Sequence, residues 1–164
     1  MLDEKTSSNG FTLIEIMVVM IIIGVILSFA TLSLSNAGLA QNLEQERLRL
    51  ASLLKLASEE AIMQFKEMGI SFKTDGYRFY ELQAQEWQAI TGRDNIFRPR
   101  NLPQGLRIDI RLEGEPIIDT NASMPQVLLL SSGEMTAFEA VFWADSDESL
   151  RYRLIGTAIG DLSI

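Results

Sequence analysis

The feature that most limits how this chain can fold is an otherwise uncharged apolar run near its N-terminus that carries one acid. The run covers residues 11–30, and its only charged side chain is that of Glu15. At 1.5 Å per residue, a helix of about 20 residues matches the roughly 30 Å thickness of a bilayer's hydrocarbon core. We therefore expect a single helix that spans a membrane.

The carboxylate of Glu15 requires an explanation, because a charge at the bilayer centre costs roughly 2.5 to 3.5 kcal/mol on insertion scales. In one interpretation, a positive partner compensates it. In the other, Thr12-Leu13-Ile14-Glu15 forms a capping box, in which Glu15 binds backbone amides at the start of its own helix. The two interpretations are compatible, and the sequence leaves both open.

The residues before the run point to a particular kind of processing. A secretory signal is cleaved after its apolar stretch, whereas here a small residue, Gly10, precedes the stretch. Residues 10–15 (Gly-Phe-Thr-Leu-Ile-Glu) followed by the apolar helix resemble the type III signal of the type IV pilin and pseudopilin superfamily. The resemblance implies that a prepilin peptidase/methyltransferase cleaves between Gly10 and Phe11 and then methylates the amine of Phe11.

The same resemblance implies a partner for Glu15, namely the α-amine of Phe11 in a neighbouring subunit. Glu15 follows Phe11 by four residues, about one helical turn, so the two groups of such a pair share one depth. Two unit charges about 4 Å apart attract by roughly 4 kcal/mol at an effective dielectric constant near 20. This assembly ion pair would therefore offset the cost of burying the acid.

Composition restricts the rest of the chain to one modest, noncatalytic head. The 164 residues contain no cysteine and no histidine, which excludes disulfides, thiolate metal sites and the commonest nucleophile and base pairs. We expect no enzyme, no cofactor and no metal. The net charge of −8 also argues against a nucleic-acid partner, because nucleic-acid binders usually display a basic stripe.

The densest cationic stretch lies in a loop region that contains prolines. Its members are Arg93, Arg98, Arg100 and Arg107. We interpret it as a solvated loop that meets acidic partner surfaces, with contact to DNA as the alternative. Residues 92–105 lack a clear periodicity, which is typical of a mobile loop.

A helical pattern continues after the apolar run, but on one face only. Charged residues, among them Glu46 and Lys55, lie mostly off this face. Spacings of three, four and seven are typical of an amphipathic helix. The apolar stripe consists of Leu39, Leu43, Leu50, Leu54, Ala57, Ala61, Phe65 and Met68.

After Gly69 the pattern becomes typical of strands. Residues 70–72 and 77–82 predict a hairpin with Asp75-Gly76 as its turn signal, and residues 106–112 alternate as a half-buried strand does. Further strands are predicted at 127–130, 137–143, 150–155 and 157–162, with turns or bulges at Ser132-Gly133 and Ile155-Gly156.

Five motifs along the chain carry a more specific resemblance. They are Glu46-x-Leu48, Glu60-Ala61 before Gly69-Ile70, Asp75-Gly76-Tyr77-Arg78-Phe79, Trp87 and the loop at 98–106. Together they resemble the H-type minor pseudopilin of the type II secretion system. The resemblance implies an α+β, pilin-like fold, in which a long N-terminal helix packs on an antiparallel β-sheet head. It divides the chain into a removed leader (1–10), a transmembrane and filament-core helix (11–34), an amphipathic extension (35–68) and a periplasmic head (69–164).

The resemblance also implies a location and partners. The chain is expected in the bacterial inner membrane with its head in the periplasm, as a subunit near the tip of a pseudopilus that supports export of folded proteins. Its expected partners are the other minor pseudopilins, the major pseudopilin, the processing peptidase, and inner-membrane lipid before assembly.

Two other functions remain open at this point. The nearer one is a minor pilin of a type IV pilus, which would serve adhesion, motility or DNA uptake. The more distant one is a membrane-tethered periplasmic enzyme, with either Glu134 and Glu139, or Asp145, Asp147 and Glu148, as a calcium or acid-base site.

Overall fold

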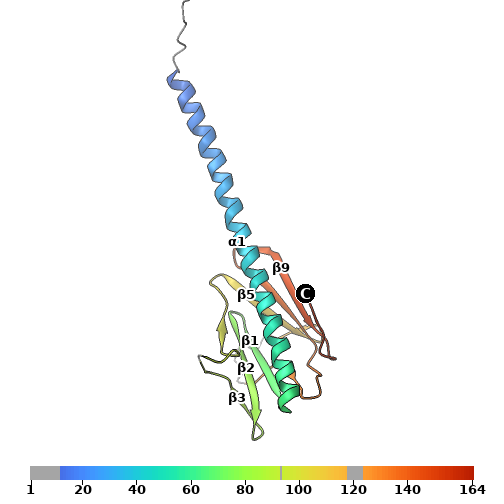
Figure 1. Ribbon diagram of the computed structural model, residues 1–164. Helices are drawn as coiled ribbons and strands as arrows, with labels where there is room; N and C mark the ends of the chain where they lie inside the picture. The colour runs from blue at the N-terminus through green and yellow to red at the C-terminus, as the bar shows by residue number, and fades with distance from the viewer. Residues whose placement is uncertain (1–11, 93, 118–123) are drawn as a thin grey trace, which may run out of the picture. The chain divides into compact units, whose positions relative to one another are not determined.

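The computed structural model describes residues 12–92, 94–117 and 124–164, without the side chains of residues 29–37 (Figure 1). The chain divides into two compact units after Gly38. Helix α1 (Leu13–Gln64) is 52 residues long and contributes to both units. All the strands belong to the second unit.

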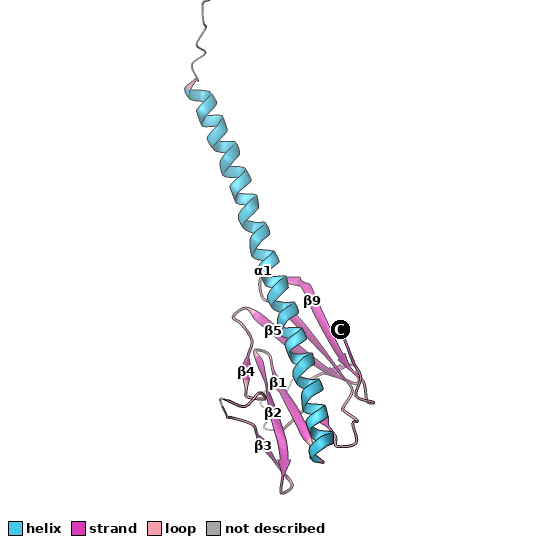
Figure 2. Cartoon of the chain, in the orientation of Figure 1, coloured by secondary structure: helices cyan, strands magenta, loops and turns pink. Residues whose placement is uncertain are grey.

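The part of α1 that belongs to the second unit buries one face. Leu43, Leu50, Leu54, Ala57 and Ala61 are fully buried, which confirms the predicted stripe over this stretch. Figure 2 shows this part of the helix beside strands of both sheets. The burial of an apolar stripe supplies most of the stability of such a helix, because propensity alone contributes little.

The helix ends earlier than the sequence predicts. The predicted apolar stripe reaches Met68, whereas α1 ends at Gln64 and Met68 begins the first strand. The N–H of Lys66 donates to the carbonyl of Ala61 (3.1 Å), and the N–H of Phe65 donates to that of Ile62 (3.4 Å). This is a Schellman ending, and Phe65 occupies its left-handed position with φ of 52°. Glycine is the usual residue there, so the sequence carries no stop signal.

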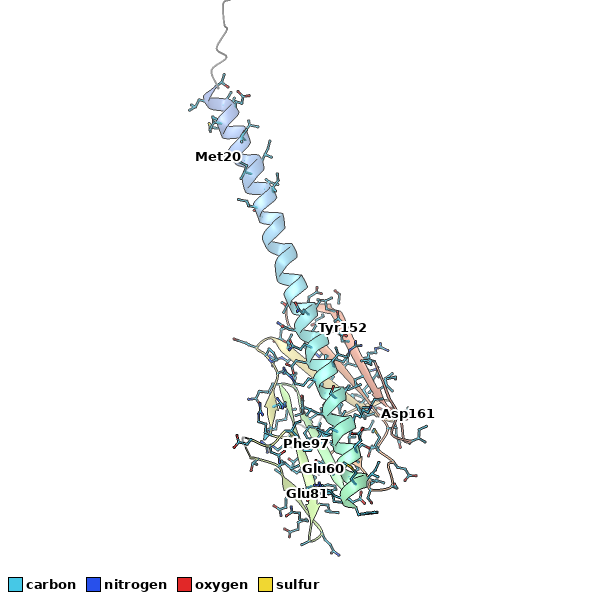
Figure 3. The ribbon with its side chains drawn as sticks, in the orientation of Figure 1. Met20, Glu60, Glu81, Phe97, Tyr152 and Asp161 are labelled. Carbon is cyan, nitrogen blue, oxygen red and sulfur yellow. The ribbon has the colours of Figure 1, made fainter. Side chains whose placement is uncertain are left out.

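An ion-pair cluster fastens this end of the helix to the sheet beside it. The ammonium group of Lys66 lies 2.9 Å from the carboxylate of Glu60 and 3.2 Å from that of Glu81. Both carboxylates are labelled in Figure 3. Burial lowers the pKa of Lys66, but the hydrogen bonds to Glu60 and Glu81 raise it by more, so the net change is upward.

The first sheet has five antiparallel strands in the order β3-β2-β1-β7, with β4 paired to the start of β2. Its strands are β1 (Met68–Lys73), β2 (Gly76–Gln83), β3 (Glu86–Ala89), β4 (Arg100–Asn101) and β7 (Val127–Leu129). The predicted hairpin is confirmed by the pairing of Lys73 with Gly76. Trp87 lies on β3, opposite Leu82 of β2, and is only partly buried.

Gly76 has a different role from the turn residue that the sequence suggested. It is the first residue of β2 and pairs with Asn101 of β4. A Cβ atom at this position would lie 2.3 Å from the carbonyl oxygen of Arg100. The close approach of β4 therefore requires the glycine, and the turn itself consists of Thr74 and Asp75.

The second sheet also has five antiparallel strands, in the order β10-β9-β8-β5-β6. Its strands are β5 (Leu106–Leu112), β6 (Glu115–Pro116), β8 (Phe138–Ala144), β9 (Asp147–Gly156) and β10 (Leu162–Ser163). On β5, Leu106, Ile108 and Ile110 are buried, as the alternation predicts. The N–H of Ile108 donates to the carbonyl of Thr74 (3.0 Å), which joins this sheet to the β1–β2 hairpin.

Two predictions at the end of the chain are wrong in part. Residues 157–160 form a turn rather than a strand, in which the N–H of Thr157 donates to the carbonyl of Asp161 (2.9 Å). Only Leu162 and Ser163 are strand. Gly156 is the last residue of β9 and not a turn residue. A side chain does not fit there, because a Cβ atom would lie 2.2 Å from the ring of Phe138.

The loop at 92–105 is anchored to the first sheet. Phe97 is buried, and its ring centroid lies 5.2 Å from that of Phe79 on β2. Leu102 is also buried, and its N–H donates to the carbonyl of Asp75 (2.7 Å). Arg93, within this loop, lies outside the described residues.

Candidate functional site

The start of α1 places Glu15 in the first helical turn. Thr12 precedes the helix, and the N–H of Glu15 donates to both its carbonyl oxygen (3.1 Å) and its hydroxyl Oγ1 (3.3 Å). This is the N-cap half of the capping box. The side chain of Glu15 is exposed, and within the described part of the chain no hydrogen bond or ion pair involves its carboxylate. Gly10 and Phe11, the predicted cleavage and methylation positions, lie outside the described residues.

Apolar side chains on all sides of α1 follow Glu15. They are exposed in the single chain, with Met20 (labelled in Figure 3) at 65% and Ile21 at 64%. An all-apolar helix is normally covered by lipid or by other helices. Among the residues that the structure describes, no helix is long and apolar enough to cross a membrane.

The predicted cationic stretch does not form one patch. Arg107, on β5, makes two hydrogen bonds to the carboxylate of Asp145, at 2.9 and 2.8 Å. These bonds raise the pKa of Arg107. Arg100 lies on β4, in the first sheet. The stretch is therefore divided between two sheets.

The carboxylates of the enzyme alternative are occupied in other ways. Glu139 lies 3.7 Å from Arg111 and 3.5 Å from Arg153, in an ion-pair row on the second sheet. Glu134 accepts a hydrogen bond from the hydroxyl of Ser132. Asp147 accepts two hydrogen bonds from Ser149, which lower the pKa of its carboxyl. No group of three possible metal ligands occurs in residues 12–92, 94–117 and 124–164.

The sequence pattern misplaced one polar residue, Glu46. It lies on the buried face of α1 between Leu43 and Leu50, with only 5% of its surface exposed. Its carboxylate pairs with Arg49 one turn along the helix. The spacing from Leu43 and Leu50 places position 46 on the stripe, so spacing alone would have located it, whereas its residue type suggested the solvent face.

Tyr77 lies near this carboxylate at the interface between helix and sheet. Its hydroxyl is buried and has no hydrogen-bond partner in the described structure. Burial, together with the negative charge of Glu46, raises the pKa of Tyr77 to about 12. Glu46 and Tyr77 are thus two polar residues within the core, and we assign them a structural role.

Comparison with known protein families decides what kind of chain this is. Residues 47–160, which include most of the packed helix and both sheets, match the family described as Type II transport protein GspH. The chain belongs to this family. Residues 5–31 match the prokaryotic N-terminal methylation motif, which includes the predicted cleavage site and Glu15.

Two relatives of known role agree with this assignment. The type II secretion system protein H of Pseudomonas aeruginosa is 33% identical over an alignment of 144 positions that covers 80% of this chain and 81% of the relative. The protein of the same name from Aeromonas hydrophila is 30% identical over an alignment of 162 positions that covers 91% of this chain and 87% of the relative. The chain is therefore a type II secretion pseudopilin of the H type, and this family is structural rather than enzymatic.

The fold of the head has a solved counterpart. The minor pseudopilin EpsH from the type 2 secretion system of Vibrio cholerae superimposes with a TM-score of 0.64 at 24% identity. The match covers 74% of this chain and 94% of EpsH. This likeness establishes a pilin-like fold with a helix packed on antiparallel sheets.

Proposed function

We propose that this pseudopilin is made as a precursor, cleaved between Gly10 and Phe11, methylated at the amine of Phe11, and then built into a pseudopilus. The observation that carries the proposal is the match of residues 5–31 to the methylation motif, in a chain whose residues 47–160 match the GspH family. Residues 1–10 are the leader, and residues 11–34 are the membrane helix that becomes the filament core. The head then lies in the periplasm.

The length of the apolar run supports the membrane step. Residues 11–30 carry no charge except that of Glu15, and about 20 helical residues cover the hydrocarbon core. Before assembly, lipid surrounds these apolar side chains. In the filament, the helices of other pseudopilins replace the lipid, so the helix keeps an apolar environment throughout.

Glu15 gives the assembly step its specificity. Its side chain is exposed in the first helical turn, one turn after the amine that cleavage creates on Phe11. An ion pair between Glu15 and the Phe11 amine of the next subunit fixes the axial register, because a slip of one helical turn, about 5.4 Å, would separate the charges. Its attraction of roughly 4 kcal/mol at an effective dielectric constant near 20 is comparable to the cost of burying the carboxylate.

The role of the assembled subunit follows from its family. In this proposal the low-copy H-type subunit lies near the tip of a short pseudopilus, in contact with other minor pseudopilins and the major pseudopilin. Growth of that filament supports export of folded proteins across the outer membrane. The alternative of a type IV pilus subunit receives no support from the family match.

The experiment compares variants in a strain that lacks the chromosomal gene and produces a known type II cargo. Gly10→Leu should leave the precursor uncleaved, with a higher apparent mass on gels, whereas Gly10→Ala should still be cleaved because alanine is small. Glu15→Ala should be cleaved and folded, but should be absent from sheared pseudopili and should not restore secretion.

Glu59→Ala is the matched control, since Glu59 is another exposed acid on the same helix. It should restore secretion as the wild type does. Normal incorporation of Glu15→Ala would overturn the ion pair, and an unchanged gel mobility of the wild type without the peptidase would overturn cleavage.

A further inference from the structure

A polar cavity of about 140 Å³ lies where β1 and β2 meet β4. Ile70 and Phe72 of β1 belong to the core, and successive strand residues point to opposite faces. Ser71 and Lys73 therefore face away from the core, and both line the cavity. The cavity is on the outer face of the first sheet, and Tyr77, whose side chain faces the core, also borders it.

Two cations of the outer face line this cavity, namely Lys73 and Arg78. Arg100 also borders it, but Arg100 lies directly opposite Tyr77, which places its side chain on the same face as that core residue. In the described part of the chain, none of the three forms an ion pair. By contrast, Arg107 of the neighbouring sheet is paired with a carboxylate. A cluster of unpaired cations in a chain of net charge −8 repels itself and is stabilised by a bound anion.

The side chain of Arg100 is only partly committed to its own chain. One terminal nitrogen donates to the carbonyl of Ile96 (3.1 Å). Its Nε is shielded from solvent and has no hydrogen-bond partner among the described residues. A buried donor without a partner costs free energy. Because Arg100 lies directly opposite Tyr77, this donor is on the core face of the sheet, and Lys73 and Arg78 are the cations that face the cavity.

A pair of hydroxyl groups adds one neutral donor to the lining, because the hydroxyl of Ser71 donates to that of Tyr80 and leaves the phenol proton of Tyr80 to donate. The side chains of Ser71 and Tyr80 are almost fully buried, and their oxygens lie 3.4 Å apart. Asp75 also lines the cavity, so Lys73 and Arg78 give it an excess of one positive charge. This moderate excess suits a carboxylate, whose planar pair of oxygens matches a guanidinium fork.

We propose that this cavity binds the carboxylate of an acidic side chain from a neighbouring protein subunit. That a neighbouring subunit supplies this carboxylate rests on the proposed function, in which the head lies against other pseudopilins. The volume accommodates several water-sized groups, so a side-chain carboxylate fits it and a folded surface does not enter. The contact would thus be a single charged anchor at the first sheet.

The binding test uses the processed full-length chain in detergent micelles, with amide NMR shifts of Ser71 and Arg78 as the readout. The probe is N-acetyl-glutamate amide, which carries one side-chain carboxylate, and N-acetyl-glutamine amide is its neutral match. Only the glutamate probe should shift these amides. Arg78→Gln and Lys73→Gln should each weaken its binding by about tenfold, the effect of one charge-assisted hydrogen bond.

Lys55→Gln is the control, because Lys55 is an exposed cation on the helix away from this cavity. It should leave probe binding unchanged. Absence of binding by the wild type, or equal shifts with both probes, would overturn the site. Binding of inorganic phosphate without binding of the glutamate probe would show that the ligand is a phosphate instead.

The source of the carboxylate is tested in cells. Arg78→Glu should lower cargo secretion although the variant is cleaved normally and retains Glu15. If the wild type binds the probe but Arg78→Glu still secretes fully, a neighbouring protein subunit is not the source of the carboxylate. That result would leave the proposed function intact, because Gly10 and Glu15 variants test the latter independently.

Discussion

A buried hydroxyl without a partner makes Tyr77 a sensitive residue in this head. Because its hydroxyl forms no hydrogen bond in the described structure, the group brings the cost of desolvation without the gain of a bond. Tyr77→Phe should therefore be as stable as the wild type at pH 7, or more stable by up to about 1 kcal/mol. Chemical denaturation of the full chain in detergent measures this difference.

The same residue predicts a pH dependence. The pKa of Tyr77 rises from 10.0 to about 12 in the folded chain, so folding favours the protonated phenol. Its contribution is complete below pH 10 and is lost between about pH 10 and pH 12, by roughly 3 kcal/mol for two pKa units. Over this interval the wild type should lose that much more stability than Tyr77→Phe. Parallel pH profiles of the two proteins would contradict this prediction.

At the scale of elements, the β2–β3 hairpin shows why one strand could not be predicted. Gln83 pairs with Glu86, so its loop consists of Ala84 and Gln85, which have φ of 48° and 69°. Two left-handed residues form a type I′ turn, for which Asn-Gly is the common sequence. Without that signal, nothing local separates β3 from the polar stretch around it.

The strained loop predicts a stabilising change. Ala84→Asn combined with Gln85→Gly should raise the free energy of unfolding by about 1 kcal/mol, because asparagine and glycine adopt positive φ at lower cost. The β5–β6 hairpin offers the reverse control, since its loop already pairs Glu113 with a glycine at φ of 86°. There, Gly114→Ala should lower stability by a similar amount. Denaturation curves that do not separate the two variants would refute this account.

Local patterns predicted other elements well. Strand β5 follows from strict alternation, and the β1–β2 hairpin from two strand-like segments joined by a short link. The end of α1 was misplaced because Phe65 stops the helix without a glycine. Gly76 and Gly156 were read as turn residues, whereas each makes room for a distant backbone or ring. Contacts between distant residues explain these errors.

At the scale of the whole molecule, the sequence predicted a helix packed on antiparallel strands but not the division into two sheets. That division depends on which strands pair: β1 lies beside β7, and β5 beside β8. Such pairings join residues far apart in the chain, and periodicity carries no information about them. The N-terminal motif differs in kind, because its residues are contiguous in the chain and a sequence pattern alone can match them.

Glu46 has a mechanical consequence under any load that acts along the axis of α1. It lies on the buried stripe where each neighbouring position is leucine or alanine. A slide of the helix by one turn would bring this charge against apolar core residues and leave Tyr77 facing a leucine. A buried polar residue can fix one register at a cost in stability. Glu46 should therefore oppose the sliding of α1 along the sheets under load.

Glu46→Leu tests this consequence. At equilibrium the variant should be as stable as the wild type or more so, since an apolar residue fits the stripe. Under optical-tweezers tension applied between α1 and the second sheet, it should yield in several small steps, whereas the wild type should yield in one. A single step at unchanged or higher force would show that the leucine stripe alone resists the load.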